Sequence, residues 1–274
     1  MNITFIGGGN MARAIIGGLL AKGHPAADLR VVEIVAAART ALEKDYGVAT
    51  FATADAALAN VDCIVLAVKP QQLRETCTHL GSHLERDQCP IISIAAGIRL
   101  ASLMQWLGGN YRRLIRAMPN TPALIGKGMT ALYAARPAVS DADFRLADAI
   151  LAAVGKTLRV TDESALDAVT AVSGSGPAYV FYFIEALEAA ARELGLDAAQ
   201  ARTLALETFV GAANLAAGAA EPPAELRARV TSKGGTTEAA LASMTRDHLK
   251  ETIIRAVQAA AARSRALGDE LDQA

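Results

Sequence analysis

A glycine-rich turn near the start of the chain constrains the fold more than any other stretch. Residues 2–6 form a short run rich in β-branched and aromatic side chains, which predicts a buried strand. It leads directly into Gly7-Gly8-Gly9-Asn10-Met11-Ala12 and an apolar helical pattern. In this G-x-G-x-x-A arrangement the first glycine makes the turn, the second lets a pyrophosphate approach the backbone, and the alanine lets the helix pack on the strand. The stretch predicts the first unit of a dinucleotide-binding Rossmann domain.

An acidic residue follows the next predicted strand at the spacing that a nucleotide site requires. Residues 29–33 form a largely apolar run that ends in Glu33, roughly 20 residues after the glycine turn. A carboxylate here accepts the ribose 2′-OH of NADH and repels the 2′-phosphate of NADPH, and Ile34 offers that phosphate no charge. We expect NADH to be used at least as well as NADPH, unless Arg39 reaches back to the phosphate. The plain alternative is a glycine turn followed by a solvated glutamate.

The alternation of strands and helices continues to about residue 160 and predicts a doubly wound α/β sheet. Ligands bind such sheets beyond the carboxyl ends of the strands, so we expect Lys69, the turn Ala95-Ala96-Gly97 and Asn120 to face the cofactor. Nearly continuous apolar runs indicate strands covered on both faces. The predicted elements are strands at 63–68, 91–97, 114–118, 129–133 and 157–160 and a helix at 141–154.

The remainder of the chain predicts helices alone, which places a domain boundary near residue 160. We assign residues 1–160 to the dinucleotide-binding domain and residues 161–274 to a helical domain. Residues 178–184 are apolar on every side, and the helices after residue 198 are rich in alanine. A helix that is apolar all round is buried in a core or between subunits, so we expect this domain to pair with a second copy of itself.

Two glycine- and hydroxyl-rich stretches in this half predict helix N-termini, at residues 173–179 and 231–238. Free N–H groups at a helix N-terminus favour anions, and a nucleotide module needs neither stretch. Together they predict a site for a small carboxylate set against the nicotinamide. The alternative that the glycines before residue 177 only allow close helix packing stays open.

Composition and charge exclude several classes of function. The net charge is −1, so neither nucleic acid nor an anionic membrane is favoured as a partner, and no apolar run reaches membrane-spanning length. We expect no signal peptide, because the first predicted strand follows the N-terminal residue at once. The three cysteines follow no metal or disulfide pattern, so we expect a reducing cytoplasm. His79 and His83 lie four residues apart without a third ligand in register, so we interpret them as surface residues and expect no metal. Without a hydrolytic triad or Cys-His pair, hydride transfer fits best.

At this point the sequence resembles the pyrroline-5-carboxylate reductase family, essentially from end to end. Five stretches carry the resemblance: residues 5–12, 67–70, 118–122, 173–179 and 231–237. The resemblance implies NAD(P)H-dependent reduction of 1-pyrroline-5-carboxylate to L-proline, the last step of proline synthesis. It also implies a Rossmann domain followed by an all-helical dimerisation domain, so that homodimers carry the site, often within a larger ring.

The resemblance also assigns site residues by position. It implies catalytic roles for Thr170, whose hydroxyl would bond the ring nitrogen, and for Glu163, whose charge would favour a cationic ring. The substrate would be surrounded by Glu163, Ser175, Gly235, Thr236 and Thr237. The cofactor would be held by Ile6, Gly7, Gly8, Gly9, Asn10, Met11, Ala12, Glu33, Ala54, Ala67, Val68, Lys69, Pro70, Ala95, Ala96, Gly97 and Asn120.

The sequence departs from the family pattern in three places, and two other functions remain open. Glu33-Ile34 stands where many bacterial members have Asn-Arg or Ser-Arg, and Ala54 stands where members often carry Asn, which leaves the choice between NADH and NADPH open. Lys233 replaces a common proline. A different two-domain dehydrogenase, such as one acting on a 3-hydroxy acid, would use a lysine in its helical part. A nucleotide-sensing module without turnover would keep only the glycine turn.

Overall fold

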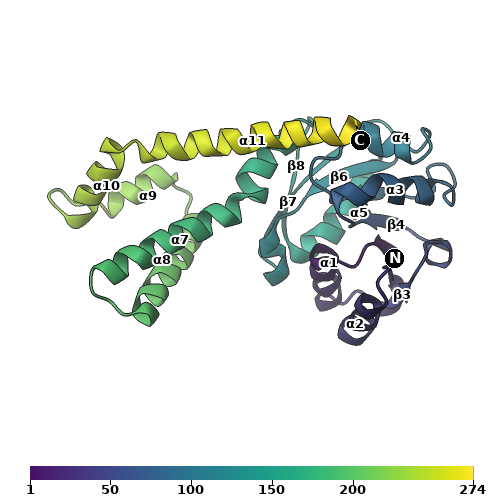
Figure 1. Cartoon of the computed structure of the whole chain (residues 1–274), viewed down its shortest axis with the longest axis horizontal. Helices are drawn as coiled ribbons and strands as arrows, with labels where there is room; N and C mark the ends of the chain where they lie inside the picture. Colours follow the sequence, from purple (N-terminus) through teal and green to yellow (C-terminus); the bar gives the residue numbers. More distant parts are fainter. Residues whose placement is uncertain (274) are drawn as a thin grey trace. The chain divides into compact units, whose positions relative to one another are not determined.

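A computed structural model describes residues 1–273 and divides the chain into two compact units (Figure 1). The first unit comprises Met1–Ser175 together with the final helical residues from Ala260 onward, and the second comprises Gly176–Ala259. Residues 161–175 and the end of the chain thus pack with the sheet, beyond the boundary predicted at residue 160.

The first unit is built on a sheet of the predicted Rossmann type (Figure 1). The strand order is β3-β2-β1-β4-β5-β6-β7-β8, with parallel pairs from β3 through to β6, an antiparallel pair β6–β7 and a parallel pair β7–β8. The order reverses between β1 and β4, which is where such sheets bind ligands. The strands are β1 (Ile3–Ile6), β2 (Leu29–Val32), β3 (Ala49–Phe51), β4 (Cys63–Leu66), β5 (Ile91–Ser93), β6 (Leu114–Met118), β7 (Gly128–Ala134) and β8 (Gly155–Arg159).

Helices cover both faces of this sheet, as the continuous apolar strands require. In β4, Cys63 and Val65 join the core that α1 and α5 cover, whereas Ile64 and Leu66 join the core that α3 and α4 cover. The predicted strands at 63–68 and 91–97 end earlier than expected, because their last residues turn into loops at the carboxyl edge of the sheet. The helices are α1 (Asn10–Ala21), α2 (Ala36–Tyr46), α3 (Pro70–Gly81), α4 (Leu100–Trp106) and α5 (Asp141–Leu151), with 3₁₀ turns η1 (Ala26–Asp28), η2 (Asp55–Leu58), η3 (Thr121–Ile125) and η4 (Ala152–Val154).

The predicted helix N-terminus at residues 173–179 is wrong. The backbone is already helical from α6 (Ala165–Val169), passes through a π-helical turn η5 (Thr170–Gly174) and continues into α7 (Gly176–Glu193). The Ser175 N–H donates to the Thr170 carbonyl (2.8 Å), a bond of the π type that no capping pattern reveals. A Cβ on Gly174 would lie 2.5 Å from Met118 Cε, so this glycine serves close packing on β6.

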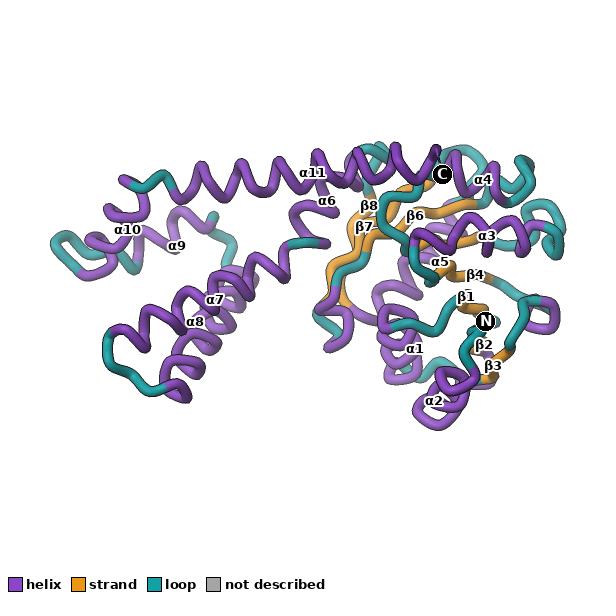
Figure 2. The backbone as a smooth tube through the Cα atoms, viewed as in Figure 1, coloured by secondary structure: helices purple, strands orange, loops and turns teal. Residues whose placement is uncertain are grey.

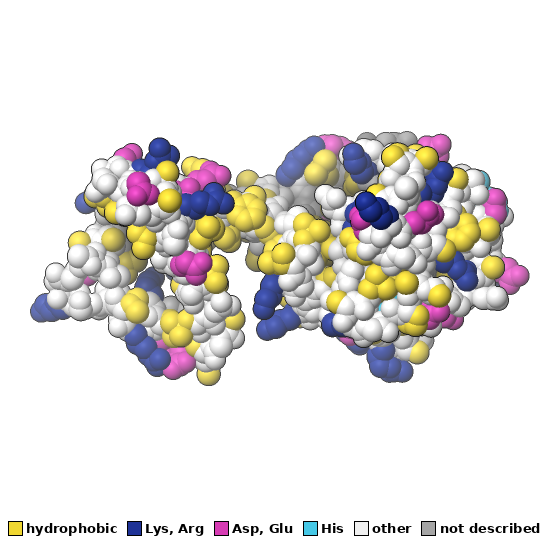
Figure 3. Space-filling view, turned by 90° about the horizontal axis from the view of Figure 1, so that it is seen from below, with side chains coloured by type: hydrophobic (Ala, Val, Ile, Leu, Met, Phe, Trp, Pro, Cys, Tyr) yellow, Lys and Arg dark blue, Asp and Glu magenta, His cyan; other side chains and the backbone are white. Residues whose placement is uncertain are grey.

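The second unit consists of helices, coloured purple in Figure 2. Asp197 begins α8 with a capping box to Gln200, which fixes the turn between α7 and α8. Large apolar side chains remain exposed on α7, including Phe181 at 61% and Tyr182 at 72%, and Figure 3 shows apolar side chains spread over the surface. No helix within residues 1–273 is long and apolar enough to cross a bilayer. The further helices are α8 (Ala198–Gly218), α9 (Pro223–Arg229), α10 (Thr236–Arg246) and α11 (Leu249–Gln273), of which α11 continues into the first unit.

Candidate cofactor and substrate site

A cleft of about 560 Å³ opens at the carboxyl ends of β1, β2 and β4, at the topological switch point of the sheet. Nine of the predicted cofactor residues line it: Ile6, Gly7, Gly8, Gly9, Glu33, Ala54, Ala67, Val68 and Lys69. The sequence interpretation missed the polar wall that α3 contributes. This wall consists of Gln72, Glu75, Thr76 and His79. These residues recur three or four positions apart, which places them on one face of the helix and is the sequence signal that would have revealed them.

The three glycines of the turn have different surroundings. Gly7 has φ +101°, and a Cβ there would lie 2.8 Å from the carbonyl oxygen of Ala67. Gly9 precedes α1, and apart from its two chain neighbours no heavy atom of the described residues lies within 4 Å of a Cβ built on it. Within residues 1–273 no side chain caps this helix start. Gly9 therefore leaves room beside free N–H groups, which is the arrangement that a pyrophosphate needs.

Glu33 is fixed in the cleft by two backbone donors. Its Oε2 accepts from the Gly8 N–H (3.0 Å) and its Oε1 from the Val35 N–H (2.9 Å). Arg39 does reach back to the end of β2, where its Nη1 donates to the carbonyls of Glu33 (2.8 Å) and Ile34 (3.0 Å). The carboxylate is thus held at the cleft wall, with further lone pairs for a ribose hydroxyl.

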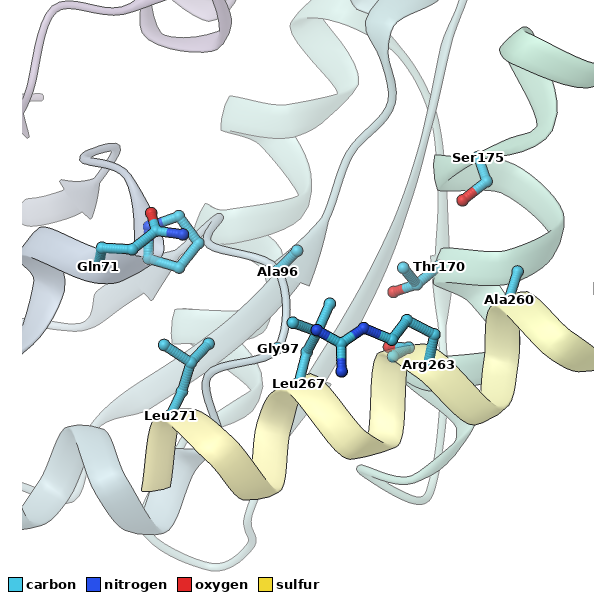
Figure 4. Close-up of a pocket in the computed structure, with 11 residues that line it drawn as sticks. Gln71, Ala96, Gly97, Thr170, Ser175, Ala260, Arg263, Leu267 and Leu271 are labelled. Atoms are coloured by element: carbon cyan, nitrogen blue, oxygen red, sulfur yellow. The ribbon is translucent and has the colours of Figure 1, made fainter. Parts of the chain in front are cut away.

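A second hollow of about 280 Å³ lies within the same unit and contains a different subset of the predicted residues (Figure 4). Pro70, Ala96 and Gly97, which the sequence assigns to the cofactor, form one side, and two hydroxyl groups come from Thr170 in the π-helical turn and Ser175 directly after it. Thr170 Oγ1 donates to the Leu166 carbonyl (2.7 Å), which leaves its lone pairs as acceptors. The sequence interpretation missed the wall from α11, formed by Ala260, Arg263, Ser264, Leu267 and Leu271.

Glu163 and Asn120 line neither cavity and instead hold the surrounding segments. Glu163 Oε1 accepts from Arg116 Nη1 (3.0 Å) and from the Leu100 N–H (2.8 Å), and the Arg116 side chain is only 7% exposed. Asn120 Nδ2 donates to the carbonyl and the hydroxyl of Ser173 (3.1 Å each), and its Oδ1 accepts from the Met129 N–H. The sequence signal for this ion pair was Arg116 itself, because a charged residue within the apolar strand β6 needs a partner of opposite charge.

The remaining predicted residues lie in helical starts and turns. Asn10, Met11 and Ala12 form the first turn of α1, where Ala12 is fully buried, and Ala95 is buried at the end of β5. In the second unit, α10 begins at Thr236 with Gly235 as its N-cap, which confirms the second predicted helix start. The Gly234 N–H donates to Glu238 Oε2 (2.6 Å), so this turn is closed on itself by its own glutamate.

The cysteines have no part in this chemistry. All three are free and buried, and burial raises the pKa of the Cys77 thiol to about 12 and also raises the pKa of Cys63 and Cys89. A nucleophilic cysteine needs a lowered pKa and exposure, so these thiols are core residues.

Comparison with known proteins agrees with this geometry. Residues 2–97 match a family model described as NADP oxidoreductase, coenzyme F420-dependent, and residues 163–267 match one described as pyrroline-5-carboxylate reductase dimerisation. The chain is 45% identical over 271 residues to the pyrroline-5-carboxylate reductase of Pseudomonas aeruginosa, covering 99% of this chain and 98% of that protein. This chain belongs to the pyrroline-5-carboxylate reductase family.

Solved reductases of the family share the architecture of the whole chain. The pyrroline-5-carboxylate reductase of Coxiella burnetii is 39% identical with a TM-score of 0.92, and the match covers 97% of this chain and 98% of that one. A Plasmodium falciparum pyrroline carboxylate reductase with NADP bound is 27% identical with a TM-score of 0.85, covering 98% of both chains. The dimerisation model covers α7, the helix on which large apolar side chains are exposed.

Proposed function

We propose that this chain reduces 1-pyrroline-5-carboxylate to L-proline with NAD(P)H. The observation that carries the proposal is the full-length 45% identity to a pyrroline-5-carboxylate reductase, together with a glycine-lined cleft at the switch point of a Rossmann sheet. NAD(P)H supplies the hydride when it is bound, and the protein contributes binding and orientation.

The cleft fits a dinucleotide by the space and donors that it offers. Gly9 and the uncapped first turn of α1 would receive the pyrophosphate, because the backbone there is open and its N–H groups favour anions. Glu33 would bind the adenosine ribose, and Ala54 would lie beside it. Lys69 and Pro70, at the start of α3, connect the cleft with the second hollow, where Ala96 and Gly97 would meet the nicotinamide.

Thr170 is proposed to bind the ring nitrogen as a hydrogen-bond acceptor. Its own proton is committed to the Leu166 carbonyl, so the oxygen lone pairs are available to the N–H of a protonated cyclic imine. A protonated imine accepts a hydride at carbon more readily than a neutral one, and orientation of the ring then supplies much of the barrier reduction. Ser175 lines the same hollow and would bind the ring from the next turn.

The substrate carboxylate is proposed to bind at Gly235-Thr236-Thr237, where a helix N-terminus and two hydroxyl groups favour an anion. The N–H groups of Gly234 and Gly235 already donate to Glu238 and Ser232, so the proposal rests on Thr236 and Thr237. For Glu163 the ion pair with Arg116 favours a positioning role. It holds the start of α4, through the Leu100 N–H, and stands shortly before the helix that carries Thr170. We infer that Glu163 affects the substrate ring indirectly, by holding these segments in place through its contacts with Arg116 and the Leu100 N–H.

Turnover with a substrate panel separates this function from the two alternatives. We expect oxidation of the reduced cofactor with 1-pyrroline-5-carboxylate and none with the oxo acids that 3-hydroxy acid dehydrogenases reduce. Cofactor oxidation with the oxo acids but not with 1-pyrroline-5-carboxylate would instead establish a 3-hydroxy acid dehydrogenase, with Lys233 as its candidate catalytic lysine. Saturable cofactor binding without turnover on any substrate would establish a sensing module.

The cofactor preference provides a second test. We expect NADH to be used at least as well as NADPH, because Glu33 places a fixed carboxylate where the 2′-phosphate would lie. Glu33→Gln should shift the ratio of kcat/KM values toward NADPH by about tenfold, or about 1.4 kcal/mol. A strong NADPH preference in the unmodified protein would contradict this, and loss of that preference in Arg39→Gln would show that Arg39 grips the phosphate.

Assembly is proposed to be an obligate homodimer through the helical domain, in the cytoplasm, and this dimer can form part of a larger ring. We expect Phe181→Glu to raise the dimer dissociation constant by about 30-fold or more, since a charge would replace an exposed aromatic side chain of α7 at roughly 2 kcal/mol. Phe181→Leu is the matched control that keeps the surface apolar. Analytical ultracentrifugation measures the dimer dissociation constant of both variants.

Phe183 is a less suitable position for this test. It lies against Phe209 (6.5 Å between ring centroids), so Phe183→Glu would disturb the fold as well. A stable, active monomer would contradict the proposal.

A further inference from the structure

A cluster of metal-ligating side chains lies on the rim of the cofactor cleft. Asp55 is the first residue of η2, His79 lies in the last turn of α3, and His83 follows that helix. Their ligand atoms all lie within 4.8 Å of one another, and the three residues are exposed. The sequence interpretation treated His79 and His83 as surface residues because it lacked a third ligand, which the fold supplies from a separate element.

We propose that Asp55, His79 and His83 form a site for a divalent transition cation of the zinc type. Two imidazole nitrogens and one carboxylate oxygen are a borderline donor set, which suits zinc, copper or nickel better than magnesium or calcium. Zinc sites with three protein ligands complete their tetrahedron with water, and the exposure of this cluster leaves that position open.

The orientation of His83 supports a ligand role. Its Nδ1 lies 2.9 Å from the His79 carbonyl and 3.0 Å from Ser82 Oγ, while its Nε2 lies 2.8 Å from Asp55 Oδ1. A carbonyl oxygen can only accept, so Nδ1 carries a proton and Nε2 is the nitrogen that faces the carboxylate. Metal-binding histidines are commonly held in this way, with the other ring nitrogen donating to a carbonyl.

The geometry needs only small side-chain movements. Ligand nitrogens and oxygens bind zinc at about 2.0–2.2 Å, which sets tetrahedral ligand atoms roughly 3.3 Å apart. His83 Nε2 and Asp55 Oδ1, now 2.8 Å apart, must therefore separate slightly to admit the cation, and any pair of ligand atoms near the 4.8 Å limit must close. The rings of His79 and His83 are already tilted against each other with centroids 4.7 Å apart, and both are exposed. His79 also lines the cofactor cleft, so the proposed cation would sit beside the cofactor without belonging to the reaction.

Metal titration of the full, untagged protein tests the proposal without turnover. After the protein has been treated with a chelator, we expect calorimetry to show that one Zn²⁺ binds per chain. Co²⁺ bound at the same site should show the visible d–d absorption of tetrahedral coordination. His83→Gln should weaken Zn²⁺ binding by at least about 10- to 100-fold, because loss of an outer-shell partner alone costs that much and His83 is proposed as a direct ligand. The chain has four histidines, so His24→Gln/His248→Gln is the matched control and should bind Zn²⁺ like the unmodified protein.

An ordinary imidazolium–carboxylate ion pair is the competing explanation for the short contact between His83 and Asp55. Unsaturable binding of Zn²⁺, or equal binding by the His79→Gln/His83→Gln and control variants, would establish the ion pair and overturn the cation site. Histidine ¹⁵N NMR spectra of the unmodified protein provide a second measurement. Zn²⁺ must shift the Nε2 resonance of His83 and leave the ring-nitrogen resonances of His24 unchanged. These spectra keep the proposal testable if the double variant does not fold.

Discussion

Gly9→Val is expected to lower kcat/KM for the cofactor by roughly 10²-fold while leaving the melting temperature unchanged. The backbone at Gly9 (φ −70°, ψ −177°) accepts any residue, and apart from its two chain neighbours a Cβ there meets no heavy atom of the described residues within 4 Å. From this Cβ, the side chain would extend into the space that we assign to the pyrophosphate. Steady-state kinetics and thermal unfolding measure the two effects separately.

Gly7→Ala is the matched comparison, with the opposite balance of effects. Here the Cβ would lie 2.8 Å from the Ala67 carbonyl oxygen, in a backbone with φ +101° that side chains rarely adopt. Such strain costs about 1–3 kcal/mol, so the melting temperature should fall by several degrees. If Gly9→Val destabilised the protein as much as Gly7→Ala, or left cofactor kinetics unchanged, the assignment of the pyrophosphate position would be wrong.

Thr170→Val is expected to lower kcat by about 10- to 100-fold, the loss typical of one positioned polar group, with cofactor binding unchanged. Valine keeps the shape of threonine and removes the oxygen that we propose as the acceptor for the ring N–H. Thr170→Ser keeps that oxygen and should retain most of the activity. Only the intrahelical bond to Leu166 is lost in the valine variant, and it is a local side-chain bond, so the fold should tolerate the change.

The two variants at Thr170 distinguish a chemical role from a structural one. If Thr170→Val kept its kcat, Thr170 would have no part in the reaction and positioning would rest on the helix start at Gly235. If Thr170→Ser lost as much activity as Thr170→Val, the methyl group and its packing would matter, since Thr170 Cγ2 lies beside Gly174 in the π-helical turn.

The cofactor half of the site was predictable because its determinants are local in the sequence. A strand, three glycines, a helix and an acid at a fixed spacing specify the turn, and the structure places Gly7, Gly9 and Glu33 in one cleft. The residues on α3 were equally local, but their helical spacing becomes informative only once the cleft is known to lie beside that helix.

The substrate half depends on interactions that sequence spacing does not encode. The helix runs on through residues 170–175 because a bond from Ser175 to Thr170 closes a π turn and Gly174 packs against Met118, which is distant in the sequence. Glu163 was interpreted as a charge near the substrate, yet its carboxylate is paired with Arg116 on β6. Such pairings follow from the order of strands in the sheet, which local patterns predict only in outline.

Transfer of a deuterium label tests the central claim most directly. With NADH deuterated at the transferable position of C4 and unlabelled 1-pyrroline-5-carboxylate, the product should be L-proline with one deuterium at C5, in an amount equal to the cofactor oxidised. Mass spectrometry and proton NMR measure both quantities. Cofactor oxidation without labelled proline, or no consumption of 1-pyrroline-5-carboxylate by the folded dimer, would contradict the account.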